Sequence, residues 1–264
     1  MSTDGTNLND EALRTQLSGT RWHTIEVVES TGSTNADLIE RSAGENVAGT
    51  VRLTTDQTAG RGRHTRVWAA PAGTQVAMSA AVDAGTNTED LGWLSLIAGL
   101  AVADAVESVT AVRPTLKWPN DVLIDDRKVS GILSEYSRTS TGGIAVIGVG
   151  VNTTMTEDQL PVPTATSLAI VTGKDVSVTD LAAAYLRRLA ELLDRWPAEL
   201  GSLAEAYRER SDTIGRRVRV VLPGDKEVVG TATGIDSAGR IVVDANGQDV
   251  IVAAADVTHL RADG

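Results

Sequence analysis

Hydrophobic residues along the chain follow two different periods, which divide it into a mixed region and a β-rich region. The stretch LGWLSLIAGLAVADAVESV at 91–109 is apolar around most of a helical circumference, which predicts a buried helix. Residues 181–196 place apolar side chains on one helical face, and Pro197 should end that helix. Buried strands are expected at 22–29, 73–82 and 142–152, the last of which is interrupted by glycines.

After about Gly215 the pattern changes to short alternating strands. RRVRVVL, KEVVGTATGI, RIVVDA and QDVIVAA are separated by PGD, DSAG and ANG, which supply turns. Four or five strands in this space predict a small β-barrel. We therefore expect a polar tail at 1–20 with a short helical stretch, a main domain at 21–214, and a C-terminal barrel at 215–264. The fold class is α+β, a mixed sheet with helices on one side followed by a small all-β barrel, and no long linker separates the two domains.

Composition removes several function classes. The chain of 264 residues contains no cysteine, which excludes disulfides and thiolate chemistry and gives no reason to expect export. The first ten residues lack the features of a signal peptide, and we find no unbroken run of about 18 apolar residues to cross a membrane. A net charge of −11 disfavours non-specific binding to nucleic acid. The sequence predicts a cytoplasmic protein without membrane contact.

One loop departs from this acidic background. Residues 57–68 read QTAGRGRHTRVW and contain no carboxylate. Glycine allows close approach of a backbone to a ligand, and arginine presents donors that match phosphate and carboxylate oxygens. The loop suggests a site for a small anion, although a solvated arginine-rich loop explains the composition equally well.

A second segment, KWPNDVLIDDRKVSGIL at 117–133, changes that balance. Only four of the 24 basic residues are lysines, and two of them, Lys117 and Lys128, lie here. Lys128 follows a turn at 125–127 and opens an apolar strand, so regular structure should fix its side chain. A lysine is a compact charge suited to a reacting phosphate or carboxylate. Lys117 is explained as well by its place at the end of a hairpin.

Taken together, four segments resemble the biotin protein ligase family. They are STGSTN (30–35), DQTAGRGR…W (56–68), KWPNDV…RKVSGIL (117–133) and GVGVN (148–152), in the family's order and approximate spacing. The resemblance covers roughly residues 22–264. It implies an enzyme that joins biotin to ATP as biotinoyl-5′-AMP and then transfers biotin to a lysine of a biotin carboxyl carrier protein domain.

The resemblance also implies the site residues. Lys128, Arg61 and Arg63 match the groups that stabilise charge at the carboxylate and the α-phosphate. The residues that match the biotin site are Ser33, Thr34, Asn35, Gln57, Gly60, Arg61, Arg63, Lys128 and Gly131. Those that match the nucleotide site are Arg63, Arg66, Trp68, Asn120, Lys128 and Asn152. Mg²⁺ is implied with ATP, and Asp121 is a weak candidate ligand.

Several alternatives stay open at this point. Trp68 serves equally well as a core residue under the loop. For Asp121, a cap of the KWPND turn explains the residue better than a metal ligand does. Lipoate ligases and octanoyl transferases share the fold but lack the GRGR and KWPND pairing. A biotin-sensing regulator is disfavoured because about 20 residues before the first strand leave no room for a DNA-reading domain, so we expect no specific DNA binding. A monomer or weak homodimer is expected, with 142–152 as an edge that would pair with a second subunit.

Overall fold

A seven-stranded mixed sheet forms the centre of the main domain. The computed structural model describes residues 7–86, 88–139, 142–222, 226–253 and 255–260. The strand order is β1-β2-β3-β7-β6-β5-β4, in which β1 and β2 are parallel and the other neighbours antiparallel. The strands are β1 (Thr24–Val27), β2 (Thr50–Thr54), β3 (Gln75–Asp83), β4 (Thr115–Lys117), β5 (Asp121–Ile124), β6 (Arg127–Thr139) and β7 (Gly142–Asn152).

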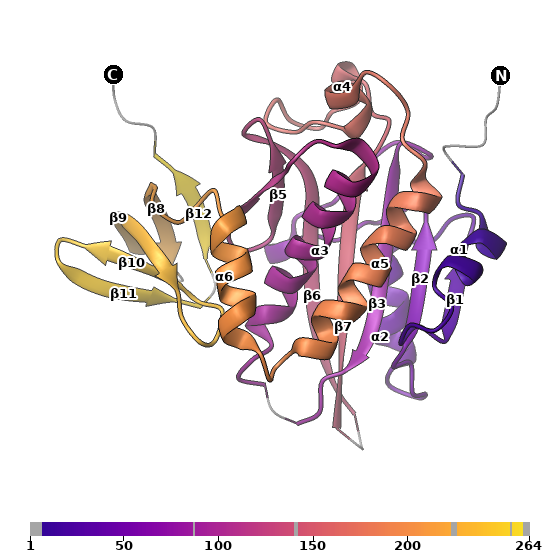
Figure 1. The fold of residues 1–264 in the computed structure, drawn as a ribbon, viewed down its shortest axis with the longest axis horizontal. Helices are drawn as coiled ribbons and strands as arrows, with labels where there is room; N and C mark the ends of the chain where they lie inside the picture. Colours follow the sequence, from indigo (N-terminus) through magenta and orange to yellow (C-terminus); the bar gives the residue numbers. More distant parts are fainter. Residues whose placement is uncertain (1–6, 87, 140–141, 223–225, 254, 261–264) are drawn as a thin grey trace.

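The long helices cover one face of this sheet (Figure 1). They are α3 (Gly92–Thr110), α5 (Val178–Arg195) and α6 (Leu200–Arg210), with the short α4 (Leu168–Thr172) at one end. Side chains alternate along β7, so Ile147 and Val149 join the core under α3, whereas Val146 joins a second cluster with Leu38 of α2 (Thr34–Arg41). The predicted mixed sheet with helices is confirmed. The prediction that the helices lie on one side of the sheet is correct for the long helices. The short helix α2 is the exception, because it covers the other face.

Helix α3 is a core helix, although it is long and apolar enough to cross a membrane. It has 19 residues and a mean hydropathy of 1.4, and 67% of the apolar window is buried inside the fold. It lies beside α5 on the same face of the sheet in Figure 1, and Trp93 and Ile97 are completely buried. We expected no segment long and apolar enough to span a membrane, and α3 meets both conditions. Its burial between other elements of the fold explains why it is so apolar.

The segment before the first strand is docked, which corrects the expected polar tail. Helix α1 (Asp10–Gln16) begins at Asn9, whose side chain caps the helix, and packs against α5 and β1. Leu13 and Leu17 are fully buried in the core. The two leucines carry the segment into the fold despite its polar composition; residues 1–6 lie outside the described residues.

The C-terminal domain is all antiparallel β, as predicted. Its order is β11-β10-β9-β8-β12, with β11 and β12 at the two ends of the order among the described residues. Two tryptophans of the main domain fix the junction, because Trp93 donates to the Ser237 carbonyl at 2.7 Å and Trp118 to that of Gly239 at 3.1 Å. The strands are β8 (Arg217–Leu222), β9 (Lys226–Ile235), β10 (Ile241–Ala245), β11 (Gln248–Val252) and β12 (Asp256–His259).

The expectation that 142–152 offers a free edge is wrong. Strand β7 spans these residues and is hydrogen-bonded on both sides, to β3 and to β6. Its glycines make room for side chains instead. A Cβ at Gly143 would lie 2.1 Å from the Tyr136 hydroxyl, and one at Gly148 would lie 2.2 Å from Asn35 Oδ1. The spacing of glycines therefore reflects close packing in the middle of a sheet.

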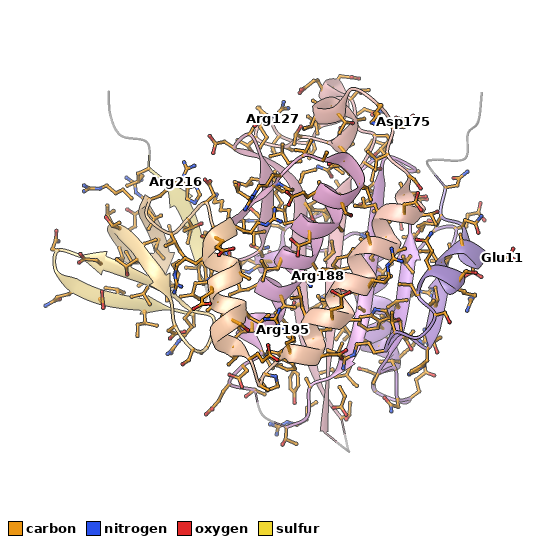
Figure 2. The ribbon with its side chains drawn as sticks, viewed as in Figure 1. Glu11, Arg127, Asp175, Arg188, Arg195 and Arg216 are labelled. Atoms are coloured by element: carbon orange, nitrogen blue, oxygen red, sulfur yellow. The ribbon has the colours of Figure 1, made fainter. Side chains whose placement is uncertain are left out.

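Three helices are joined by one carboxylate, and its removal should cost stability. Asp104 of α3 accepts from Arg188 of α5 and from Arg210 of α6, each at 2.8 Å, and Figure 2 shows Arg188 on α5. Asp104→Asn should lower the free energy of unfolding by roughly 1–2 kcal/mol, because two partly buried cations each lose one of their two carboxylate partners and keep only Glu191 and Glu107. Urea denaturation measures this.

The exposed pair of Arg219 and Glu227, whose charged atoms are 3.6 Å apart, provides the control. Glu227→Gln should change stability by about 0.5 kcal/mol or less, because an exposed pair is screened by solvent. Equal effects of the two substitutions would contradict the role of Asp104.

Candidate functional site

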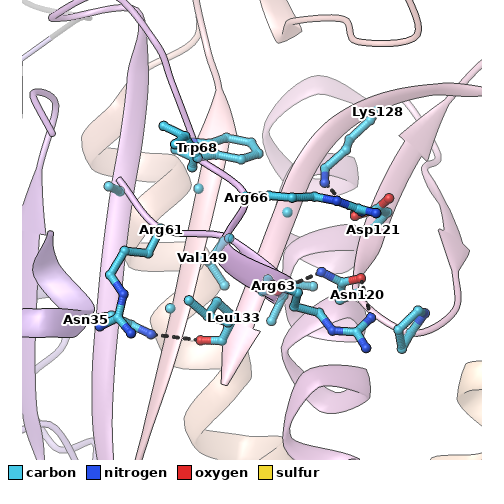
Figure 3. Close-up of a pocket in the computed structure, with 18 of the residues that line it drawn as sticks. Asn35, Arg61, Arg63, Arg66, Trp68, Asn120, Asp121, Lys128, Leu133 and Val149 are labelled. Atoms are coloured by element: carbon cyan, nitrogen blue, oxygen red, sulfur yellow. Dashed lines mark hydrogen bonds and ion pairs between the residues drawn. The ribbon is translucent and has the colours of Figure 1, made fainter. Parts of the chain in front are cut away.

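A cavity of about 490 Å³ opens where the 57–68 loop, the sheet and β12 meet. Its floor is the face of the sheet opposite α3, and residues of the loop lie over it (Figure 3). Residues of the C-terminal domain also line it: Val221, Asp256, Val257 and Thr258. Most of the residues predicted for the site line it: Ser33, Thr34, Asn35, Gln57, Arg61, Arg63, Arg66, Trp68, Asn120, Asp121, Lys128 and Gly131. The two cationic sequence segments thus converge on one place.

One residue from each of five neighbouring strands forms a row across the floor. The residues of this row have small side chains or none over most of its length and charged side chains at one end. Ala77, Gly150, Gly131, Asp121 and Lys117 are successive register partners across β3, β7, β6, β5 and β4. Residues paired in this way project from the same face of a sheet. The row therefore forms a flat strip that ends in an acidic and a basic side chain, and we call it the glycine row.

Trp68 lies on the glycine row. A Cβ at Gly150 would lie 2.5 Å from the Trp68 ring, and one at Gly131 would lie 2.9 Å from it. The indole nitrogen donates to Gln75 Oε1 at 2.6 Å, which fixes the ring in its plane. Trp68 is thus a wall of the cavity, and this decides against the alternative of a buried core tryptophan.

A bulge in β6 brings Lys128 onto the cavity face. The register passes from Val122–Ser130 to Leu123–Lys128, which leaves Val129 as the extra residue. Without the bulge Lys128 would project from the same face as Ser130, away from the cavity. With it, Lys128 Nζ lies 2.6 Å from Asp121 Oδ1 and 5.6 Å from the centre of the Trp68 ring.

The other end of the cavity is polar and dense in hydrogen bonds. Ser33 caps α2, and Gln57 Oε1 accepts from the Thr34 amide at 2.9 Å. Ser79 donates to Asn35 Oδ1 at 2.6 Å, and Asn35 Nδ2 donates to the Leu133 carbonyl at 2.9 Å. Ser79, Gly148 and Leu133 are register partners, two residues along the strands from the glycine row. The polar end thus lies about 7 Å from the glycine row.

Three cations of the site are held by carboxylates of the protein. Besides the Lys128 pair, Arg61 lies 2.6 Å from Glu135, and Arg66 pairs with Asp256 of the C-terminal domain. Arg63 differs. It reaches the Asn120 side chain at 3.4 Å, the Ala255 carbonyl at 3.5 Å and the His64 ring at 3.5 Å, and burial lowers the pKa of its guanidinium. Its ordinary pKa is far above neutrality, so Arg63 remains charged.

Two predicted residues take positions outside the cavity lining. Asn152 is buried at the end of β7, where its amide donates to the Thr166 carbonyl at 2.9 Å. It therefore supports the 164–168 segment, whose Thr164 carbonyl accepts from the Lys128 amide. Gly60 is buried beneath Trp68, and a Cβ there would lie 2.3 Å from the Trp68 carbonyl oxygen. Direct ligand contacts of Asn152 and Gly60 stay predictions.

Sequence reasoning missed the contribution of distant strands. Ser79 of β3, Glu135 of β6 and Asp256 of β12 all contact predicted site residues. None belongs to a segment with a distinctive composition, and only strand register and domain packing bring them to the cavity. Only Glu135 could have been found from the sequence. It lies six residues after the start of a predicted strand, and alternation along that strand places it on the same face as Gly131.

The arrangement suits an elongated ligand with three different parts. The polar end offers buried donors and acceptors for a compact polar group, and Trp68 offers an aromatic face. Between them the cations can offset negative charge on a carboxylate and a phosphate brought close together. Such a site favours the joining of two anions, which needs positioning and electrostatic stabilisation more than a nucleophile of the protein.

Comparison with known proteins agrees with this geometry. Residues 25–152 match the Biotin/lipoate A/B protein ligase family, and residues 213–260 match the Biotin protein ligase C terminal domain. The biotin–[acetyl-CoA-carboxylase] ligase of Mycobacterium tuberculosis is 44% identical over 96% of both chains. That of Paracoccus denitrificans is 33% identical over 86% of this chain and 97% of its own.

Solved structures show the same fold. The biotin protein ligase from Aquifex aeolicus in complex with biotin and ATP superposes with a TM-score of 0.77 at 24% identity, over 91% of this chain and 100% of that one. The match spans both the mixed sheet and the C-terminal strands. Because two family matches and a 44% identical relative of equal length agree with the fold and with the cavity, this chain belongs to the biotin protein ligase family.

Proposed function

We propose that this chain activates biotin with ATP to biotinoyl-5′-AMP and then transfers biotin to a lysine of a biotin carboxyl carrier protein domain. The observation that supports it most is the order of groups along the cavity: a polar end, a cluster of cations, and Trp68 on the glycine row. The polar end fits the cyclic urea of biotin, the cations fit a carboxylate beside an α-phosphate, and Trp68 fits the nucleotide.

In the first step, a carboxylate oxygen of biotin forms a bond to the α-phosphorus of ATP. The bond from that phosphorus to its bridging oxygen breaks, and pyrophosphate leaves with the electron pair. Lys128 lies where both anions would meet, so its charge stabilises the crowded transition state more than either separate substrate. Arg61 and Arg63 add charge from the loop side.

In the second step, the neutral amine of the carrier lysine attacks the carbonyl carbon of the anhydride. The bond to the phosphate oxygen breaks, AMP leaves with the electron pair, and the amine loses a proton. The cations that favoured adenylate formation now stabilise the departing phosphate. Water must be kept from the anhydride in between, and the 57–68 loop over the cavity is placed to exclude it.

Mg²⁺ would enter with ATP and be bound mostly by phosphate oxygens. Among the described residues no group of three or more His, Cys, Asp or Glu side chains could hold a metal ion. Asp121 faces the cavity but pairs with Lys128. When bound, Mg²⁺ would neutralise phosphate charge, and Asp121 would be a protein carboxylate beside it.

We further propose a cytoplasmic ligase that acts on carrier domains of biotin-dependent carboxylases, as a monomer or weak dimer. The absence of cysteine fits a reducing compartment. The net charge of −11 disfavours non-specific binding of these 264 residues to DNA.

ATP–pyrophosphate exchange tests the proposed function. Purified protein with ATP and labelled pyrophosphate should show exchange when biotin is present and none when lipoate or octanoate replaces it. A carrier domain added afterwards should gain biotin on one lysine, which mass spectrometry detects. Exchange with lipoate in place of biotin, or none with any acid, would overturn the proposal.

The loop should retain the intermediate. Arg63→Ala should increase the release of biotinoyl-AMP into solution about tenfold, because the loop loses its half-buried charge over the cavity. Chromatography of the free adenylate without carrier measures the release. Arg208→Ala, at an exposed position on α6, is the matched control and should release no more than the wild type. Equal release from all three proteins would contradict this role.

A further inference from the structure

Five basic side chains line the cavity, and two of them have no acidic partner. Arg61, Arg66 and Lys128 are paired with carboxylates. Among the described residues, Arg63 and Lys117 have no carboxylate within ion-pair distance. Arg63 already belongs to the loop that covers the cavity. Lys117 is the first residue of the KWPND segment, and none of the contacts proposed so far uses it.

Lys117 lies at the end of the glycine row, beyond Asp121 and Lys128. It is the register partner of Asp121, so the two side chains project from the same face of the sheet. It is also close to the C-terminal domain, because its charge adds to burial in lowering the pKa of His259 on β12. Val221 and Thr258 of that domain also line the cavity. Lys117 thus occupies the junction of the two domains.

The order along the row matches the order of groups in ATP. Trp68 lies over Gly150 and Gly131, Lys128 follows beside Asp121, and Lys117 comes last. With the nucleotide against Trp68 and the α-phosphate at Lys128, the remaining two phosphates extend toward Lys117. Because Lys117 is unpaired, its charge is available to a polyanion without first breaking an internal ion pair.

We propose that Lys117 binds the leaving pyrophosphate, and with it the β- and γ-phosphates of ATP, at the junction of the two domains. The inference rests on the proposed function. When the bond from the α-phosphorus to the bridging oxygen breaks, that oxygen takes the electron pair, and negative charge grows on the pyrophosphate. A cation fixed at that place stabilises the charge as it develops. Lys117 has no part in the second step, since pyrophosphate has then departed.

The separation of the two steps makes the test selective. Lys117→Met removes the charge and keeps most of the apolar stem, and Lys117→Gln is a second variant with a polar end. The full-length protein is assayed for the inhibition constant of pyrophosphate and the KM of ATP in adenylate formation. Transfer from preformed biotinoyl-AMP to a carrier domain is measured separately. Lys174→Met, an exposed lysine after α4, is the control.

Both Lys117 variants should raise the pyrophosphate inhibition constant and the KM of ATP by about ten- to a hundredfold. Biotin affinity and the transfer rate from preformed adenylate should equal those of the wild type, and Lys117→Arg should restore much of the loss. An unchanged inhibition constant in either variant overturns the inference, as does an equal loss in both steps, which marks a structural role. If the wild type shows no biotin-dependent exchange, the proposed function itself fails; if it does while the variants behave normally, only Lys117 is misassigned.

Discussion

Lys128→Ala is expected to reduce adenylate formation roughly 10²- to 10³-fold, the usual effect of removing one preorganised charge from a site of developing anion. The Lys128 side chain is 33% exposed and ion-paired with Asp121, so the change removes charge and little core volume. Biotin-dependent ATP–pyrophosphate exchange measures the loss. Thermal unfolding should change little.

Lys174→Ala is the matched control for Lys128, because Lys174 is exposed and lies outside the cavity lining. It should show wild-type exchange. Near-normal exchange in Lys128→Ala would remove Lys128 from the chemistry, whereas low exchange together with a large drop in thermal stability would indicate a damaged fold.

Gly150→Ala should have the second largest effect, through the position of Trp68. The new methyl group would lie 2.5 Å from the Trp68 ring, so the ring must move by about 1 Å to reach normal contact. Misplacement of this size in an active site lowers kcat/KM by about 10²-fold. We expect that loss for ATP, with biotin affinity retained, because Gly148 and Asn35 form a separate row. Steady-state kinetics and biotin titration separate the two effects.

Gly201→Ala is the control for Gly150, because Gly201 lies in α6 with no atom within 4 Å of an added Cβ. Its kinetics should match the wild type. Unaltered ATP kinetics in Gly150→Ala would show that Trp68 has no part in nucleotide binding.

Elements with strong periodicity were predictable from the sequence. The expected strand at 142–152 is β7, and the helices expected at 91–109 and 181–196 are α3 and α5, because each buries a continuous set of apolar side chains. Strand β12 was missed, since Asp256–His259 is short and alternates only weakly. The helix α6 and the docking of α1 depend on packing partners far away in the chain, which local patterns do not contain.

The site was predictable where chemistry and sequence coincide. The loop arginines and Lys128 stand out because basic residues are clustered there in an acidic chain. What could not be predicted is how they are held: a bulge of one residue at Val129 turns Lys128 into the cavity, and Asp256 reaches Arg66 across 190 residues. Register and domain packing decide both, and a one-residue shift of register would place Lys128 on the other face.

The wall that β12 gives to the cavity has a consequence for synthesis of the protein. The cavity is lined by residues from both ends of the chain. Ser33 lies near the N-terminus, whereas Asp256, Val257 and Thr258 lie near the C-terminus. A nascent chain can assemble the sheet, Trp68 and Lys128 well before β12 has been translated. The polypeptide therefore acquires its complete cavity only after residue 258 has left the ribosome.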